Sequence, residues 1–447
     1  MHGRAESSDK LQAVFGDPVD EKALEQINVV LEDDRTIAGA LMADHHLGYS
    51  MPIGGVVAYQ DAISPSGVGY DIACGNKAVR TDTLVDDLGD LLPWMRMIEQ
   101  RISFGVGRVR SGSEDDDVDH PLFSDPIWSE LDAEPGQPLK QKAYMQLGTV
   151  GSGNHYVDLL RDEEGYLWVA NHFGSRGLGH AIASMGLLWA HGDGPAQRDE
   201  PAVLDLGTER GQLYLAGMTL AGEYAYAGRD YVIDHVLALL GHPNVTLEVH
   251  NHHNFAWLED DLWVVRKGAT PLTLDPAFIG GSMGDISVIV RGKRDGRRED
   301  GPVDAVEDVG AMGSAPHGAG RVMSRTAAAG KLRRMWHCRN RNCRFQPVRA
   351  SGNAAPFEGG KCPECQLPLS RSRMRDTSGA AVDWDATRKS LSERGIVVLG
   401  SGADEAPQVY KDLASVLALH TNIEVLHTLH PVGVVMAGSD IHDPYKD

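Results

Sequence analysis

Four of the five cysteines in this chain of 447 residues stand in one short segment, and their spacing constrains the fold more than any other feature. Cys338 and Cys343 are followed, after 18 residues, by Cys362 and Cys365. Two pairs spaced in this way are typical of a zinc ribbon, in which four thiolates hold one Zn²⁺. Two disulfides are the alternative, and they are rare in the cytosol. We therefore expect a small zinc-ribbon-like insertion over residues 331–375.

The same segment is strongly basic. Between Lys331 and Arg375 there are 11 Lys and Arg against 2 Glu, a net charge of +9, whereas the whole chain carries −21 and the remainder therefore −30. An acidic body argues against binding nucleic acid over the whole surface. The arginines of the insertion, with Trp336 and Phe345 for stacking, predict binding of RNA backbone and unstacked bases. A purely stabilising insertion with a solvated basic face is the alternative.

The rest of the chain has the composition of a globular protein, with 42% apolar and 23% charged residues. No apolar run approaches the roughly 20 residues that span a bilayer, and the first ten residues are polar, so we expect a cytoplasmic protein without membrane contact. Periodicity predicts helices at 21–27, 84–103, 179–190, 212–240 and 405–419, and strands at 245–249, 261–266, 286–291 and 396–399. Residues 37–42 form a further apolar run.

The mixture of these helices and strands favours an α+β fold. We expect a single large catalytic domain with the small insertion inside it. Residues 1–330 form the first part of that domain and residues 376–447 the second part.

The fifth cysteine, Cys74, stands alone in the glycine-rich string Gly67–Gly75, three residues after Asp71. Thiolate, carboxylate and imidazole together suit a first-row metal such as Zn, Fe or Mn. Glycine-rich backbone and Asn side chains can bind phosphate. Seven strings combine these residue types: Asp71–Cys74, Gly151–His155, Asn171–Arg176, His250–Asn254, Gly280–Met283, His317–Arg321 and Asp404–Pro407. The residues alone thus predict metal-dependent phosphate chemistry.

Longer strings around these positions closely resemble the RtcB family of GTP-dependent 3′-phosphate/5′-hydroxyl RNA ligases. The resemblance runs from about Met42 to about Gly438 and is interrupted by the cysteine-rich insertion. The strings that carry it are Gly67–Gly75, Gln146–His155, Gly174–Gly179, Arg266–Ala269, Ser314–Arg325 and Asp404–Asp412. The resemblance implies an RtcB-like fold and an enzyme that seals RNA with broken 3′-phosphate or 2′,3′-cyclic phosphate and 5′-hydroxyl ends.

The resemblance also implies two Mn²⁺ ions. Asp71, Cys74 and His155 would hold the first ion. Cys74, His172 and His253 would hold the second, so the thiolate of Cys74 would bridge the pair.

His317 would be the catalytic nucleophile. By resemblance, it attacks the α-phosphorus of GTP to form a histidine–GMP adduct, the RNA 3′-phosphate takes the GMP, and the 5′-hydroxyl displaces it. Arg176 would contact the RNA-end phosphate, and His252 would be structural. The positions that match nucleotide contacts, besides His317, are Asn154, His155, Tyr156, Asp158, His253, Asn254, Gly280, Gly281, Ser282, Met283, Ser287, Gly318, Ala319 and Gly320.

Two departures from the family pattern bear on nucleotide choice. Asp158 stands where the family usually has Glu, and Met436 or Ala437 stands where a lysine is expected. A nine-residue extension, Ser439–Asp447, follows and contains Lys446. Because methionine cannot donate a hydrogen bond to a base, we expect weaker selectivity for GTP.

Two other functions remain open from the sequence. The first is an RNA end-processing enzyme, either a nucleotidyltransferase that caps 3′-phosphates or a cyclic phosphodiesterase, that does not seal. The second is a non-catalytic RNA damage sensor that uses the zinc module.

Overall fold

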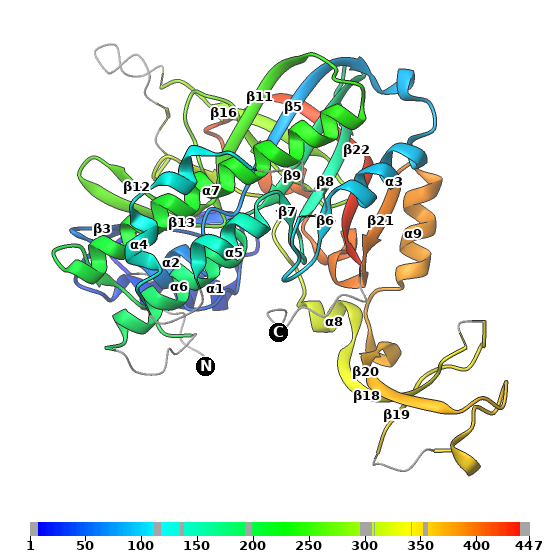
Figure 1. Cartoon of the computed structure of the whole chain (residues 1–447). Helices are drawn as coiled ribbons and strands as arrows, with labels where there is room; N and C mark the ends of the chain where they lie inside the picture. Colours follow the sequence, from blue (N-terminus) through cyan, green and yellow to red (C-terminus); the bar gives the residue numbers. More distant parts are fainter. Residues whose placement is uncertain are drawn as a thin grey trace.

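The structure is a computed structural model and describes residues 8–110, 118–134, 138–192, 199–295, 306–307, 309–340, 342–351 and 356–438. Figure 1 shows a body of sheets with helices packed on their outer faces and a small module that projects from it. Helices and strands are both abundant, which confirms the predicted α+β class. The C-terminal extension with Lys446 lies outside the described residues.

The larger sheet has the strand order β11-β5-β9-β8-β22-β16-β15, all antiparallel, and β21 pairs in parallel with β22. Successive residues of a strand point to opposite faces of this sheet, and both faces are buried. Val79 and Val169 pack in the core on one face, and Ala78 and Trp168 pack in the core on the other. The strands are β5 (Gly75–Leu84), β8 (Tyr156–Arg161), β9 (Tyr166–Phe173), β11 (Val245–His252), β15 (Ala277–Ile279), β16 (Ser287–Gly292), β21 (Val397–Ser401) and β22 (Ile423–Gly438).

A second sheet has the order β1-β2-β3-β13-β12. Helix α1 (Glu21–Leu31) packs on it; its first turn is capped by Asp20, whose side chain accepts two backbone N–H bonds, and Ile27 is fully buried. The strands are β1 (Leu11–Val14), β2 (Thr36–His46), β3 (Ile53–Tyr59), β12 (Asn254–Glu259) and β13 (Leu262–Lys267).

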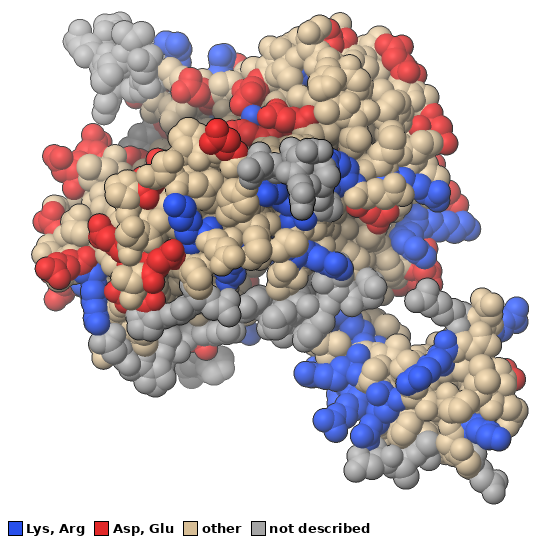
Figure 2. Space-filling view, viewed as in Figure 1, with Lys and Arg blue, Asp and Glu red and all other residues tan. Residues whose placement is uncertain are grey.

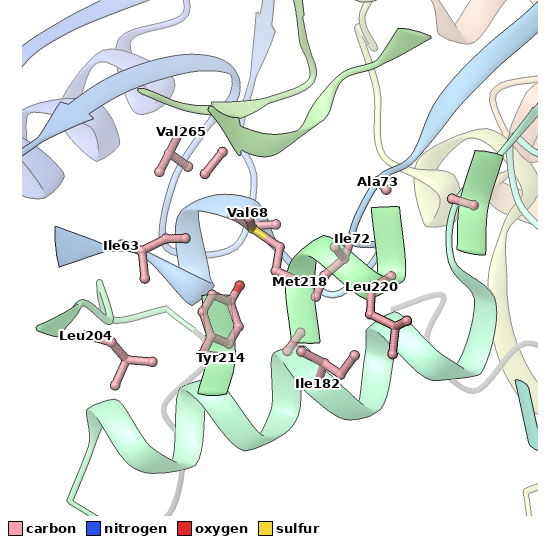
Figure 3. Packing of buried hydrophobic residues seen from close by; sticks show 14 of the residues in the cluster. Ile63, Val68, Ile72, Ala73, Ile182, Leu204, Tyr214, Met218, Leu220 and Val265 are labelled. Atoms are coloured by element: carbon pink, nitrogen blue, oxygen red, sulfur yellow. The ribbon is translucent and has the colours of Figure 1, made fainter. Parts of the chain in front are cut away.

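Helices α6 (Arg176–Ala190) and α7 (Glu209–Leu239) pack against each other over the core that supports the loop before β5. Figure 3 shows Met218 and Leu220 of α7 beside Ile72 of that loop. The loop is therefore fixed by buried apolar contacts. Among the described residues, we find no helix that is long and apolar enough to cross a membrane.

The remaining elements are short. The other helices are α2 (Pro65–Val68), α3 (Leu91–Arg101), α4 (Ile127–Leu131), α5 (Leu139–Gln146), α8 (Arg325–Ala329), α9 (Trp384–Glu393) and α10 (Leu413–Leu417). The short strands are β4 (Ala62–Ile63), β6 (Ser103–Phe104), β7 (Thr149–Val150), β10 (Leu204–Asp205), β14 (Ala269–Pro271) and β17 (Ser314–Pro316).

The projecting module is a three-stranded antiparallel sheet in the order β19-β18-β20. Its strands are β18 (Lys331–Cys338), β19 (Val348–Arg349) and β20 (Leu369–Asp376). Figure 1 shows it connected to the body through α8. The boundaries at 330 and 376 remain our interpretation of where the catalytic part is interrupted.

Most of the predicted elements are present, and the predicted helix over 405–419 is wrong. Only α10 forms there, preceded by two 3₁₀ turns, Ala403–Glu405 and Pro407–Val409. Ala406 is extended (φ −63°, ψ 151°) because the residue before a proline is driven out of the helical conformation. A new helix can begin only after Asp412, which caps α10.

Candidate metal centre and nucleotide pocket

Four neighbouring strands of the larger sheet bring the predicted metal ligands to one of its ends. Cys74 and His155 directly precede β5 and β8, whereas His172 lies near the end of β9 and His253 follows β11. Because the strands are antiparallel in the order β11-β5-β9-β8, the starts of β5 and β8 lie beside the ends of β9 and β11. Ligands far apart in sequence therefore meet at a single place.

A tight turn places Asp71 and Cys74 together. The backbone N–H of Cys74 donates to the carbonyl of Asp71 at 3.0 Å, and Ala73 has a positive φ of 59°. The fully buried guanidinium of Arg229 donates to the carbonyls of Ala73 and Phe173, at 3.0 and 2.7 Å. The role of Arg229 cannot be predicted from the sequence, because nothing near an arginine inside a long helix indicates this contact.

The side chains form two groups that share one thiol. Cys74 Sγ lies 3.6 Å from His155 Nε2 and 3.2 Å from His172 Nε2. His155 Nε2 lies 2.9 Å from Asp71 Oδ2, and His172 Nε2 lies 3.3 Å from His253 Nε2. Each group, Asp71–Cys74–His155 and Cys74–His172–His253, is compact enough to surround one ion. The predicted ligands are thus brought together, and Cys74 belongs to both sets.

The chemistry of this donor set fits a metal ion. Burial, and then the neighbouring His155, lower the pKa of His172 to about 3, so its imidazole is neutral and can act as a ligand. Its Nδ1 lies 3.0 Å from the carbonyl of Asn154, which leaves Nε2 facing Cys74. Burial and the Asp71 carboxylate raise the pKa of the Cys74 thiol. A bound cation would reverse this effect by stabilising the thiolate.

His317 is held by a buried carboxylate. Its Nδ1 lies 2.6 Å from Asp44 Oδ2, and the backbone N–H groups of His317 and Gly318 donate to the same oxygen at 3.1 and 3.3 Å. Burial alone would raise the pKa of Asp44, but His317 beside it holds that pKa below its usual value. An ionised Asp44 accepts the Nδ1 proton and leaves the Nε2 lone pair of His317 free. The His253 ring lies 4.8 Å away, centroid to centroid.

Asp44 was not predicted from the sequence. It lies inside the buried strand β2, among residues that read as core, and it meets His317 only through tertiary contact. Gly320, with φ 74°, allows the loop to come this close, because a Cβ there would collide with the Asp44 carbonyl.

A cavity of about 240 Å³ opens between this histidine and the cysteine–histidine cluster. Most of the predicted nucleotide contacts line it. Ser287 and His155 do not: the Ser287 hydroxyl accepts the N–H of Gly281 at 3.0 Å and so supports the loop that does, and His155 lies beside Asp71 and Cys74. The predicted residues in its wall are Asp71, Cys74, Asn154, Tyr156, Asp158, His172, His253, Asn254, Gly280, Gly281, Ser282, Met283, His317, Gly318, Ala319 and Gly320.

One wall of the cavity is formed by β8 and β22. Met436 pairs with Tyr156, and Val434 with Asp158, so all four share one face of the sheet and line the cavity. Burial raises the pKa of Asp158 well above its usual value, and its Oδ1 has no partner among the described residues. A buried carboxyl with an unpartnered oxygen, on the same face as the thioether of Met436, thus lines the cavity.

Arg176 lies at the edge of the metal centre. It begins α6 with a positive φ of 56°, and its guanidinium is 3.4 Å from His155 Nδ1. Burial would raise the pKa of Asp71, but the neighbouring His155 and Arg176 lower that pKa to about 2. The guanidinium is thus placed beside the ligands, where an anionic group would meet it.

The four remaining cysteines come together in the projecting module. Sγ of Cys338 lies 3.3 Å from that of Cys365, and Sγ of Cys343 lies 3.6 Å from that of Cys362. These separations exceed the ~2.05 Å of a disulfide and approach the edge of a tetrahedron of thiolates around Zn²⁺, roughly 3.8 Å. The cluster is compatible with a zinc site.

The chain is similar to known proteins of one family. The family model for tRNA-splicing ligase RtcB matches residues 31–354. The RNA-splicing ligase RtcB of Escherichia coli K12 is 34% identical over 319 residues, covering 65% of this chain and 75% of that protein. The tRNA-splicing ligase RtcB of Archaeoglobus fulgidus is 30% identical over 395 residues, covering 70% and 79%.

The family match and these relatives show an enzyme of the RNA ligase class. The chain belongs to the RtcB family.

Proposed function

We propose that this protein joins an RNA 3′-phosphate or 2′,3′-cyclic phosphate end to a 5′-hydroxyl end, with GTP as the nucleotide and His317 as the residue that carries GMP. The main support for the proposal is the position of His317. Its Nδ1 lies 2.6 Å from Asp44 Oδ2, and its ring lines the same cavity as the Cys74–His172–His253 group. A nucleophile, its orienting base and candidate ligands for phosphate-binding ions therefore surround the same space.

Two Mn²⁺ ions are the cofactors we propose. Asp71, Cys74 and His155 would hold one ion, and Cys74, His172 and His253 the other. Metal ions at such a position stabilise negative charge on attacking and leaving oxygens of a phosphoryl group. The convergence of three imidazoles and the Asp71 carboxylate around one buried thiol supports this assignment, because these are the ligand types that a first-row metal ion takes.

His317 would form a bond from Nε2 to the α-phosphorus of GTP, with pyrophosphate as the leaving group. Asp44 keeps the proton on Nδ1 and stabilises the positive charge that develops on the ring. An RNA 3′-phosphate oxygen then attacks the same phosphorus and frees His317. The RNA 5′-hydroxyl finally attacks the activated 3′-phosphate and releases GMP. Arg176 is placed to bind that RNA phosphate.

A single assay tests the proposal against its alternatives. Purified protein is incubated with Mn²⁺, α-labelled GTP and an RNA stem-loop broken to give 3′-phosphate and 5′-hydroxyl ends. We expect a labelled protein adduct and a sealed RNA. Capped or opened ends without sealing would indicate an end-processing enzyme, and binding without chemistry would indicate a damage sensor.

We also propose one structural Zn²⁺ at Cys338, Cys343, Cys362 and Cys365, and a location in the cytoplasm. The five cysteines are all free thiols, and a reducing compartment keeps such thiols available for metals. Metal analysis of the purified protein checks the zinc, with one ion per chain expected.

A further inference from the structure

The projecting module carries a row of arginines on one face of its sheet. In the register of β18 and β20, Arg334 lies opposite Arg373, Trp336 opposite Arg371, and Leu332 opposite Arg375. Directly opposed residues of antiparallel strands share a face. We call the face formed by Leu332, Arg334, Trp336, Arg371, Arg373 and Arg375 the arginine face.

The centre of this face has uncompensated charge. Arg334 and Arg373 are both exposed and directly opposed, and neither has an acidic partner among the residues that the structure describes. Like charges at such positions destabilise a sheet. Figure 2 shows that Lys and Arg gather on this module, whereas acidic side chains are spread over the body. An anion bound between the two arginines would offset this repulsion.

The inner end of the arginine face lies close to the cavity that contains His317. At its inner end, Arg375 donates to the carbonyl of Gly330 at 3.0 Å and lies 3.7 Å from a carboxylate oxygen of Asp404. The next residue, Glu405, lines the cavity that contains His317. The arginine face thus leads away from the place where the RNA ends would react.

The outer end of the row offers an aromatic ring. The guanidinium of Arg371 lies 5.6 Å from the centre of the Trp336 ring, and the indole N–H of Trp336 has no partner among the described residues. Cys338 ends β18, two residues after Trp336, so the cysteine cluster holds this end of the strand in place. An indole beside a guanidinium is a platform on which an unpaired base can stack.

The opposite face of the same sheet contains a carboxylate that offsets part of its positive charge. Arg333, one residue from Arg334, lies 3.5 Å from the carboxylate of Asp376, and Arg349 pairs with the same buried carboxylate. Lys331, also on this opposite face, pairs in register with Asp376. The two faces therefore differ: a buried carboxylate lies among the basic residues of the opposite face, whereas Arg334 and Arg373 lie opposite each other without one among the described residues.

We propose that the arginine face binds the phosphates of a single-stranded RNA segment that continues from the reacting end. Arg375, Arg373 and Arg371 are spaced two residues apart, roughly 7 Å along the strand, a spacing comparable to that of successive phosphates in an extended strand. Trp336 then stacks a base at the outer end. This inference rests on the proposed function and adds a second, remote RNA site to it.

The test compares two variants that each remove two charges. Arg334→Gln with Arg373→Gln alters the arginine face, and Lys331→Gln with Arg333→Gln alters the opposite face. Affinity of the full-length, zinc-loaded protein for an unstructured single-stranded RNA is measured by fluorescence anisotropy at several salt concentrations. We expect the first variant to bind the RNA about tenfold more weakly. The slope of log K against log salt concentration should be about 1.4 less steep, because each of the two lost phosphate contacts contributes about 0.7. We expect the second variant to resemble the wild type.

Ligation kinetics give a second readout. We expect the first variant to raise KM for RNA with little change in kcat, because the site is remote from the chemistry. Formation of the His317 adduct needs no RNA and should stay at the wild-type rate. Zinc content and melting temperature check that both variants are folded.

The proposal would be overturned if the two variants lost RNA affinity equally, or if the first variant lost none, because the proposal assigns RNA binding to the arginine face alone. These outcomes are distinguishable from failure of the proposed function. If that function is wrong, the wild type itself forms no adduct and seals no RNA, whatever the state of the arginine face.

Discussion

Asp44 is the residue through which the fold controls His317. An isolated imidazole exposes either ring nitrogen, whereas here a buried carboxylate holds Nδ1 and two backbone N–H groups hold the carboxylate. The orientation of Nε2, the nitrogen that we propose as the nucleophile, is thereby fixed before any substrate arrives.

Replacing Asp44 by Asn tests this control. An amide can donate to Nδ1 and so favour the wrong tautomer, with the proton on Nε2. We expect adduct formation to slow by about 100-fold, within the range of acid–base effects, while His317→Ala abolishes it. The rate of label transfer from GTP measures both, and an adduct in His317→Ala would show that another residue is the nucleophile.

Replacing Cys74 by Ser tests the shared thiol. Because Cys74 belongs to both ligand groups and a neutral hydroxyl cannot replace a thiolate, we expect the loss of both Mn²⁺ ions. Metal analysis after dialysis gives the result. One ion retained at full occupancy would mean that Cys74 does not bridge.

We expect nucleotide choice to depend on the wall formed by Asp158 and Met436. Burial favours the neutral carboxyl of Asp158, which can donate as well as accept, and a thioether discriminates little, so we expect ATP to form the adduct at a measurable fraction of the GTP rate. Met436→Lys would place an ammonium diagonal to Asp158, favour its ionised form and sharpen the preference for GTP. If the unmodified protein rejects ATP completely, a different group reads the base.

At the scale of elements, we expect the cysteine-rich module to be an addition that the larger sheet does not need for its fold. Its own sheet, β19-β18-β20, has no strand in common with the two sheets of the body. We expect Cys362→Ser to lose the zinc and to expose residues 331–375 to proteases. Adduct formation at His317 should continue at a similar rate. Loss of the adduct would instead show that the module supports the active site.

The elements also show where sequence patterns are informative. Helix α7 agrees with its predicted pattern because its apolar residues recur over many turns, whereas α10 is shorter than predicted because Pro407 interrupts the helical conformation before it. Strand β2 extends beyond the apolar run at 37–42, since a run of apolar residues does not reveal where a strand ends.

For the whole molecule, buried histidines predict acid sensitivity. Burial lowers the pKa of both His46 and His420 to about 4. Below the unfolded value of about 6.5 the unfolded chain binds the proton and the folded protein does not, so stability falls as the pH falls from about 6.5 towards 4.

His420→Gln provides the test. Glutamine keeps an acceptor for the N–H of Ala43, which His420 Nε2 accepts at 3.2 Å, but it does not titrate. Between pH 6 and 4.5 we expect the unfolding free energy of this variant to fall less steeply than that of the wild type, by about 1 kcal/mol per pH unit. Urea unfolding at several pH values measures the slopes, and identical slopes would contradict the assignment.

The sequence by itself determined which residues are chemically capable: a lone cysteine beside a carboxylate, histidines in glycine-rich strings, and four cysteines with zinc-ribbon spacing. These signals are local, because ligand type and spacing lie within a few residues. Only the tertiary structure decided that antiparallel strands bring Cys74, His155, His172 and His253 to one end of a sheet.

The tertiary structure also decided the roles of Asp44 and Arg229, which have no local sign. Asp44 is one polar residue inside a buried strand, and Arg229 is one cation inside a long helix. Each acts on a segment more than 50 residues away, through contacts that exist only after the chain has folded. The arginine face follows the same rule, since the register of β18 and β20 sets which arginines lie opposite each other.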